Sequence, residues 1–220
     1  MSQVFRPYSN VIARVSIVGA VLLVGGGLVG LDRIWRSGYN TGQDVSREQP
    51  VPFSHKHHAG ELGIDCRYCH TSVEVSANAG FPPTQTCMNC HSQIWTQSPT
   101  LEPVRASWRT NESINWTKVY DLPDYVYFNH SIHVNKGVGC VTCHGRVDRM
   151  DAVYQAQPLS MSWCLNCHRQ PEKFLRPLDQ VTSMTYTAPG GDQLKAGMSL
   201  KQEFGIRDSQ YMTNCSTCHR

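Results

Sequence analysis

The residues best suited to chemistry are the ten cysteines and ten histidines, which share one repeated pattern. Every cysteine lies in a Cys-x-x-Cys-His motif, and the motif occurs five times. In chain order the motifs are Cys66, Cys69 and His70; Cys87, Cys90 and His91; Cys140, Cys143 and His144; Cys164, Cys167 and His168; and Cys215, Cys218 and His219. This pattern is the attachment signal of a c-type haem. It predicts five covalent haem c groups, each with its iron bound by the motif histidine.

The spacing within the motif explains why it suits a porphyrin. On a helical turn, the first, fourth and fifth positions share a face. Two thiols can then add to the two vinyl groups of one porphyrin while the histidine reaches the iron from the same side. Zinc bound by Cys-x-x-Cys pairs does not require a histidine after every second cysteine. A disulfide framework has no cysteine left to form it. The motif therefore favours haem over both alternatives.

The five remaining histidines equal the number of second axial ligands that five closed haems require. Four of them lie in a Phe-x-His-x-x-His pattern that occurs at 53–58 and again at 128–133. Two haem motifs follow each copy, which indicates an internal repeat of a two-haem unit. Because the two histidines of a copy are one helical turn apart, they must serve different irons. The predicted distal ligands are His55, His58, His130 and His133.

The sequence leaves the distal ligand of the fifth haem open between a methionine and His57. Met161 and Met212 each stand three residues before the first cysteine of a motif. A methionine ligand raises the potential of a haem, although packing is the commoner role of this residue. His57 is two positions from His55, about 200° around a helix, so it would point to a different haem or to solvent. The other methionines that stay in the candidate set are Met150, Met184 and Met198.

Composition indicates that the polypeptide has little core of its own. The 220 residues include 20 Lys and Arg against 17 Asp and Glu, so the chain is mildly basic and a nucleic-acid partner is not indicated. The mean hydropathy is −0.38 although 40% of residues are hydrophobic, because much of the apolar content lies in one N-terminal run. The large porphyrin faces would replace the missing side chains. The predicted fold is mostly α with high loop content, wrapped around five haems, plus one N-terminal transmembrane helix.

That N-terminal run, residues 15–31, contains 17 uncharged residues between Arg14 and Asp32. Its length meets the lower limit for a membrane-spanning helix. A cleaved secretory signal is the alternative, but the run is longer than a usual signal core and no Ala-x-Ala site follows it. We expect an uncleaved anchor in the cytoplasmic (inner) membrane. Because haem c is attached outside the cytoplasm, the haem-bearing part should lie on the periplasmic side.

These patterns predict seven successive segments. They are a cytoplasmic N-terminus at 1–14, the transmembrane anchor at 15–31, a linker at 32–50, di-haem repeat 1 at 51–97, a connector at 98–124, di-haem repeat 2 at 125–175, and a C-terminal segment with the fifth haem at 176–220.

Several stretches also resemble a known family. The two Phe-x-His-x-x-His units look like the class III multihaem cytochrome arrangement. FSHKHHAGELGIDCRYCH, FPPTQTCMNCH, DLPDYVYFNHSIHV and MSWCLNCHR together resemble the pentahaem cytochrome subunit of alternative complex III, a quinol:electron acceptor oxidoreductase. The resemblance implies an iron–sulfur subunit of molybdopterin-enzyme type, polytopic quinol-binding membrane subunits and a monohaem cytochrome as partners. It also implies a soluble copper protein or cytochrome, or a terminal oxidase, as the electron acceptor.

The ligand count favours electron transfer over catalysis. If every iron is six-coordinate, none is free to bind a substrate, so no catalytic residue is predicted and the chain is not an enzyme by itself. One alternative is a small membrane quinol dehydrogenase, although the first haem motif begins 35 residues after the apolar run. The other is a multihaem oxyanion reductase, which needs one open haem.

Overall fold

The structure is a computed structural model that describes residues 5–219. The chain forms two compact units, and the boundary between them lies between Gln43 and Asp44. Within the described residues, β pairing is limited to two isolated antiparallel bridges, Ser46 with Tyr154 and Val138 with Leu175. The predicted mostly helical class is therefore confirmed.

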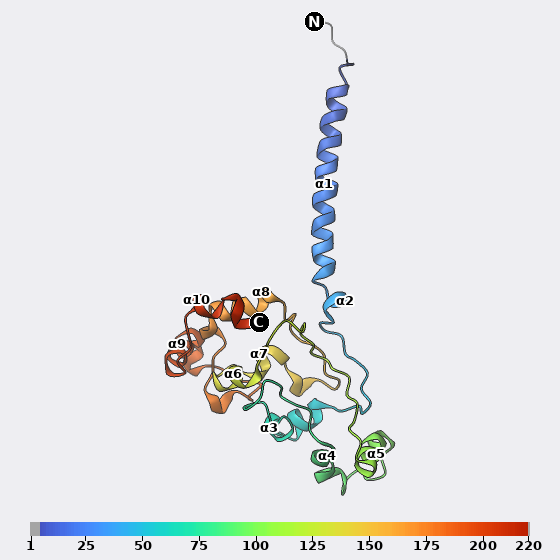
Figure 1. The fold of residues 1–220 in the computed structure, drawn as a ribbon, viewed down its shortest axis with the longest axis vertical. Coiled ribbons are helices and arrows are strands. Elements are labelled where there is room, and N and C mark those ends of the chain that lie inside the picture. Colours follow the sequence, from blue (N-terminus) through green and yellow to red (C-terminus); the bar gives the residue numbers. More distant parts are fainter. Residues whose placement is uncertain (1–4, 220) are drawn as a thin grey trace. The chain divides into compact units, whose positions relative to one another are not determined.

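The first unit contains α1 (Ser9–Trp35) and the short α2 (Gly38–Thr41). Figure 1 shows α1 as one long uninterrupted helix. All of its side chains are exposed or half-exposed. The helix is long and apolar enough to cross a membrane, and a signal sequence near the N-terminus can have the same length and composition. The helix extends beyond the predicted run at both ends, so the predicted linker begins as helix. An ion pair between Asp32 and Arg36, four residues apart at 2.8 Å, supports its last turn.

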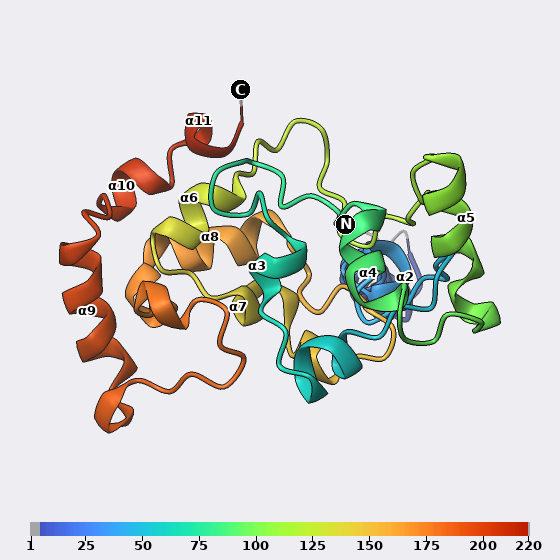
Figure 2. The same ribbon diagram turned by 90° about the horizontal axis from the view of Figure 1, so that it is seen from below.

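The second unit is built from short helices joined by extended segments (Figure 2). The helices are η1 (Lys56–Glu61), α3 (Cys66–Cys69), α4 (Thr84–His91), α5 (Glu102–Thr110), α6 (His130–Asn135), α7 (Cys140–His144), α8 (Met161–Arg169), α9 (Gln193–Glu203), α10 (Ser209–Met212) and α11 (Cys215–Cys218). Single 3₁₀ turns lie at η2 (Pro99–Leu101), η3 (Val147–Arg149), η4 (Pro171–Lys173), η5 (Leu178–Gln180) and η6 (Pro189–Gly191).

Each Cys-x-x-Cys-His motif begins on a helix of its own, namely α3, α4, α7, α8 and α11. Three of these helices start at a residue whose side chain accepts a backbone N–H of the first turn: Asp65, Ser160 and Asn214. Such caps satisfy donors that a helix cannot satisfy itself. Local sequence thus places the two cysteines of each motif one turn apart.

Few apolar side chains are buried in the described part of the chain. Eight hydrophobic residues are buried, and only Leu175 and Val181 among the large ones are completely so. One cluster joins Val51, Leu101 and Val104, with Cys87 of the second motif packed against it. The small core agrees with the expectation that porphyrin faces supply buried surface in the complete protein.

The two distal-histidine segments differ in helix type, whereas the sequence predicts the same turn for both. The second forms α6, but the first forms η1, a π-helix. Gly60 lies in this wide turn, and a Cβ placed there would be only 2.2 Å from the carbonyl oxygen of Asp148. The absence of a side chain at Gly60 lets η1 pack directly against the backbone of η3.

Candidate haem-binding sites

The cysteines of the five motifs form one spatial row. The thiol of Cys66 in the first motif is hydrogen-bonded to that of Cys140 in the third. Cys69 of the first motif is near enough to Cys87 of the second to contribute to the raised pKa of Cys87. In the same way Cys143 neighbours the fourth motif, and Cys164 of the fourth neighbours Cys218 of the fifth. The spatial order of the motifs is therefore second, first, third, fourth, fifth.

Figure 2 shows the same succession of helices. The helix α4 lies toward the right of the second unit, α3 and α7 lie near its centre, and α8 and α11 lie further to the left. Chain order and spatial order differ because the first di-haem repeat is reversed relative to the second. The sequence contains no signal for this reversal.

Hydrogen bonding and burial shift the pKa values of several thiols in the row. The bond between Cys66 and Cys140 raises the pKa of Cys66 and lowers the pKa of Cys140. Burial raises the pKa of Cys143 to about 12 and that of Cys167 to about 11. All ten cysteines are free of disulfides, so each is available for a thioether bond.

The cysteines at the two ends of the row differ from the others in exposure, whereas the sequence predicts one role for all ten. Cys90 of the second motif and Cys215 of the fifth are exposed, and the remaining eight are half-buried. The other cysteine of each of these two motifs, Cys87 or Cys218, is half-buried, so the exposure is confined to one thiol of each motif. The side chains of Cys90 and Cys215 therefore have little protein around them.

Three predicted distal histidines face three motif histidines at nearly equal distances. Ring centroids are 6.2 Å apart for His58 and His91, and 6.2 Å apart for His133 and His168. They are 6.4 Å apart for His130 and His144. A metal–imidazole bond is about 2 Å long and the ring nitrogen lies roughly 1 Å from the centroid, so one metal ion between two rings needs a separation of about 6 Å. These pairs therefore fit an iron bound on both sides.

The fourth predicted distal histidine, His55, lies near His70. Burial lowers the pKa of His55 to about 4, and the neighbouring His70 and His58 contribute to this lowering. Its Nδ1 is buried and has no partner within the described chain. Burial likewise lowers the pKa of His144 to about 4, with contributions from His130 and His70. Both rings are held neutral, which is the form that binds a metal.

Backbone carbonyls orient most of the histidine rings. The Nδ1 atoms contact a carbonyl oxygen at 2.7 to 3.3 Å in seven of the ten histidines, which are His58, His70, His91, His130, His133, His168 and His219. A ring that donates from Nδ1 leaves the lone pair on Nε2. Such fixing of the second nitrogen is characteristic of metal-ligating histidines. These histidines therefore suit a haem iron both by their tautomers and by the distances between their rings.

The phenylalanine of each distal motif positions both of its histidines, a role that the sequence analysis did not assign. Phe53 stacks on His58 at 4.3 Å and meets His55 edge-on at 4.8 Å. Phe128 stacks on His133 at 4.6 Å and meets His130 edge-on at 4.8 Å. The signal was present in the sequence, because the phenylalanine recurs at the same spacing in both copies.

His57 does not share the surroundings of the fifth motif. Its Nδ1 contacts a carboxylate oxygen of Glu61 at 2.8 Å, and its ring lies parallel to that of Trp95 at 6.4 Å. Trp95 in turn neighbours His91 of the second motif, at 6.4 Å. The second and fifth motifs stand at opposite ends of the row. His57 therefore lies beside the second motif and away from the fifth.

Of the two leading methionine candidates, Met161 lies on α8, which carries the fourth motif, and Met212 lies on α10, which precedes the fifth. Met161 begins α8 and is 61% exposed, whereas Met212 ends α10, which packs against α8. The carbonyl oxygen of Met212 contacts Nδ1 of His168 at 2.8 Å. At the fifth motif itself, Nδ1 of His219 contacts the carbonyl oxygen of Tyr125 at 3.0 Å.

The other three methionines have different surroundings. Met150 is buried and packs beside Gly145. Met184 lines a hollow next to Cys66 of the first motif, and Met198 is exposed on α9.

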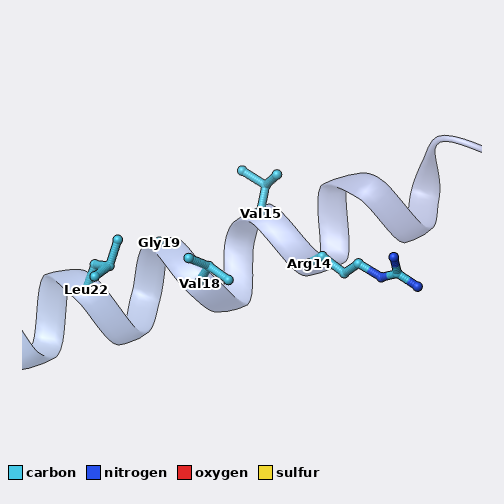
Figure 3. A pocket seen from close by; sticks show the side chains of 5 residues that line it. All are labelled: Arg14, Val15, Val18, Gly19 and Leu22. Carbon is cyan, nitrogen blue, oxygen red and sulfur yellow. The ribbon is translucent and has the colours of Figure 1, made fainter.

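Two further features do not form a site. Among residues 5–219, no group of three or more His, Cys, Asp or Glu converges as a protein-only metal site requires. Figure 3 shows a shallow apolar hollow on α1, lined by Arg14, Val15, Val18, Gly19 and Leu22. All five residues come from one helix, so the hollow is the space between neighbouring side chains.

Comparison with known proteins divides the chain into two parts. The family model described as "Class III cytochrome C family" matches residues 36–115, and the one described as "Cytochrome c7 and related cytochrome c" matches residues 126–220. The chain is 29% identical over 143 residues to "Menaquinone reductase, multiheme cytochrome c subunit" of Nitratidesulfovibrio vulgaris. The match covers 56% of this chain and 68% of that protein. The first matched stretch contains two haem motifs and the second contains three.

Proposed function

We propose that this multihaem c-type cytochrome of electron transfer holds five six-coordinate haems and passes single electrons along them. The observation that carries the proposal is the set of three histidine pairs with ring centroids 6.2 to 6.4 Å apart. An iron that is closed on both faces has no position for a substrate. The chain is accordingly an electron-transfer component rather than a catalytic enzyme.

The proposed ligand sets follow the contacts. The ten motif cysteines form the thioether bonds, Cys90 and Cys215 included, and His70, His91, His144, His168 and His219 are the proximal ligands. The distal partners are His55 for the first haem, His58 for the second, His130 for the third and His133 for the fourth. The distal ligand of the fifth haem is Met161 or Met212. Each distal segment thus connects two haems.

Bound haem supplies an iron that gains or loses one electron. The residues of the chain decide where each iron stands and which atom faces it. The backbone carbonyls fix the histidine tautomers, and the phenylalanines fix the angle between the two rings of each distal segment. The row of motifs then gives the electron path the order second, first, third, fourth, fifth. Its two ends are the motif of Cys87 and Cys90 and the motif of Cys215 and Cys218.

A membrane complex is the proposed setting. The apolar helix α1 supports a single-pass anchor in the inner membrane, with the haems on the periplasmic side. The family resemblance supports a place beside an iron–sulfur subunit, polytopic quinol-binding subunits and a monohaem cytochrome, in the manner of alternative complex III. In this setting the haems carry electrons from quinol to a periplasmic copper protein or cytochrome, or to a terminal oxidase.

The opposite direction of electron flow is the second candidate. The relative from N. vulgaris is described as a subunit of a menaquinone reductase. A similar subunit could accept electrons from a periplasmic donor and deliver them toward a quinone. A row of haems along these motifs would have two ends, so it fits either direction of electron flow.

Electron paramagnetic resonance of the oxidised, purified protein tests the haem proposal first. We expect five haems per chain by pyridine haemochrome assay, all low-spin and unchanged by cyanide or nitrite. A high-spin haem that responds to either probe would contradict the closed-iron proposal and favour the oxyanion-reductase alternative. Substituting Met161 or Met212 by leucine should convert one haem to high-spin for only one of the two variants.

Purification from detergent-solubilised membranes tests the setting. Co-purified iron–sulfur and polytopic subunits support the complex, whereas a single-chain cytochrome that oxidises quinol unaided supports the small quinol dehydrogenase. With the complex in hand, haem reduction by a menaquinol analogue indicates the quinol-oxidising direction. Quinone reduction by the pre-reduced complex indicates the reverse.

A further inference from the structure

Arg176 is a buried cation outside the haem motifs. Of the described residues that are buried, it is the only one with a full charge, and 8% of its surface is exposed. It lies in the extended segment between η4 and η5, directly after the fully buried Leu175. Its backbone N–H donates to the carbonyl oxygen of Gly137 at 2.9 Å, so the chain holds the residue in place next to the bridge between Val138 and Leu175.

The guanidinium of Arg176 is incompletely satisfied. One Nη donates to the carbonyl oxygen of Ser183 at 2.9 Å, and the group lies 5.2 Å from the ring centre of Tyr186. Its Nε–H has no partner within the described chain, and neither does the buried hydroxyl of Tyr186. No carboxylate among residues 5–219 forms an ion pair with it. Two neighbouring residues therefore each hold a buried polar atom without a partner.

Gly139 shows that the chain makes room for this guanidinium. A Cβ at Gly139 would lie 2.2 Å from Cζ of Arg176, so any side chain there would displace it. Gly139 directly precedes Cys140, the first cysteine of the third motif, whose thiol contacts Cys66 of the first motif. The cation is thus placed where the first and third motifs meet.

A buried cation without a counter-charge costs several kcal/mol, so this arrangement calls for an anion. The haems proposed for these motifs bring carboxylates of their own in the form of propionates. We propose that Arg176, together with the hydroxyl of Tyr186, binds a haem propionate at the junction of the first and third motifs. Arginine suits this ligand because its planar N–H groups match both carboxylate oxygens. The inference rests on the proposed attachment of haem at these motifs.

Such a contact has an electrical consequence. Reduction adds an electron to the haem, and a nearby cation in a low-dielectric site favours the reduced state. Removal of Arg176 should therefore lower the potential of one haem. We expect Arg176→Gln to reduce the one-electron equilibrium constant at that haem at least tenfold, which corresponds to about 59 mV.

Arg67→Gln is the matched control. It also removes one positive charge beside a haem cysteine, but Arg67 is 42% exposed and paired with Asp65 and Glu74. Solvent and those carboxylates screen its charge, so its effect on the haem potentials should be several-fold smaller.

Redox-difference infrared spectroscopy with haem propionates labelled with ¹³C identifies the ligand directly. The proposal expects a labelled carboxylate band that shifts in Arg176→Gln and in Tyr186→Phe but not in Arg67→Gln. Arg176→Lys keeps the charge, so it should shift the band while moving the potential less than Arg176→Gln does. It also supplies a readout if the glutamine variant does not fold.

An unchanged labelled band in Arg176→Lys and Tyr186→Phe would overturn the proposal, as would equal potential changes in Arg176→Gln and Arg67→Gln. The haem count of the unsubstituted protein separates this failure from that of the proposed function. Five low-spin haems with no effect at Arg176 would leave the proposed function standing and remove only this inference.

Discussion

The two di-haem repeats, residues 51–97 and 125–175, reach the same arrangement of histidines by different local means. In both, a phenylalanine stacks on the second histidine, whose Nδ1 contacts a carbonyl four residues earlier. Yet the first repeat uses the π-helix η1 and the second uses the α-helix α6. The two repeats therefore arrange their histidine rings in the same way on backbones of different helix type.

The helices that begin the first motif of each repeat differ in charge. Asp65 caps α3, and its carboxylate is also bound by Arg67 and Thr182. At the equivalent place before α7 stands Gly139, whose missing side chain leaves room for the guanidinium of Arg176. One repeat thus presents an anion at this point and the other a cation, so haems bound at the first and third motifs would be electrically unequal.

Removal of a distal histidine should have the largest effect on either repeat. His58→Ala and His133→Ala should each open one iron, so that one haem of five becomes high-spin and binds cyanide. The measurement is electron paramagnetic resonance with and without cyanide. His57→Ala serves as the control, because its ring contacts Glu61 and Trp95, and we expect its spectrum to stay fully low-spin. A low-spin His58→Ala spectrum would refute the assignment of that ligand.

The phenylalanines should show the next largest effect. Phe53→Ala and Phe128→Ala remove half-buried rings that contact two histidines each, and we expect a loss of roughly 2–3 kcal/mol in unfolding free energy. Guanidinium unfolding followed by haem absorbance measures it. Leucine at either position should recover part of the loss. Equal losses of stability would show that the phenylalanine has the same structural role in both repeats, whereas no loss in Phe128→Ala would limit that role to the first repeat.

Gly60 tests the difference in backbone. Gly60→Ala places a methyl group against the carbonyl of Asp148, and we expect a destabilisation of about 1–3 kcal/mol. The counterpart in the second repeat is Asn135, whose side chain donates to the carbonyl oxygen of Glu74 at 2.8 Å. Asn135→Ala should cost only about 1 kcal/mol, by the same unfolding measurement. Comparable stability of Gly60→Ala and the unsubstituted protein would show that η1 can move away from η3.

Asp65 should give the smallest effect, visible as a dependence on pH. Hydrogen bonding from Arg67 lowers the pKa of Asp65 to about 2 in the folded protein, against 3.8 ordinarily. Its stabilisation is therefore complete above about pH 4 and is lost as the pH falls through about 2. Asp65→Asn should lower stability at pH 7 by about 1 kcal/mol, reduced by solvent exposure, and flatten the acid limb of the stability curve. An unchanged acid limb would mean that Asp65 does not couple protonation to folding.

The sequence by itself determined the chemistry of this protein. Five Cys-x-x-Cys-His motifs and two Phe-x-His-x-x-His copies specify haem attachment and helical ligand segments, because each depends on residues within one or two turns of chain. The apolar run at 15–31 and the caps at Asp65 and Asn214 are equally local.

Only the tertiary structure decided which histidine faces which motif, and in what order the motifs stand. The contact between Cys66 and Cys140, the exposure of Cys90 at one end of the row and the burial of Arg176 beside Gly139 all depend on segments far apart in the chain. Such contacts leave no periodic signal in the sequence, because they depend on how extended segments pass one another. The same reason explains why the π-helix was not predicted: the close approach of Gly60 to Asp148 is a property of packing.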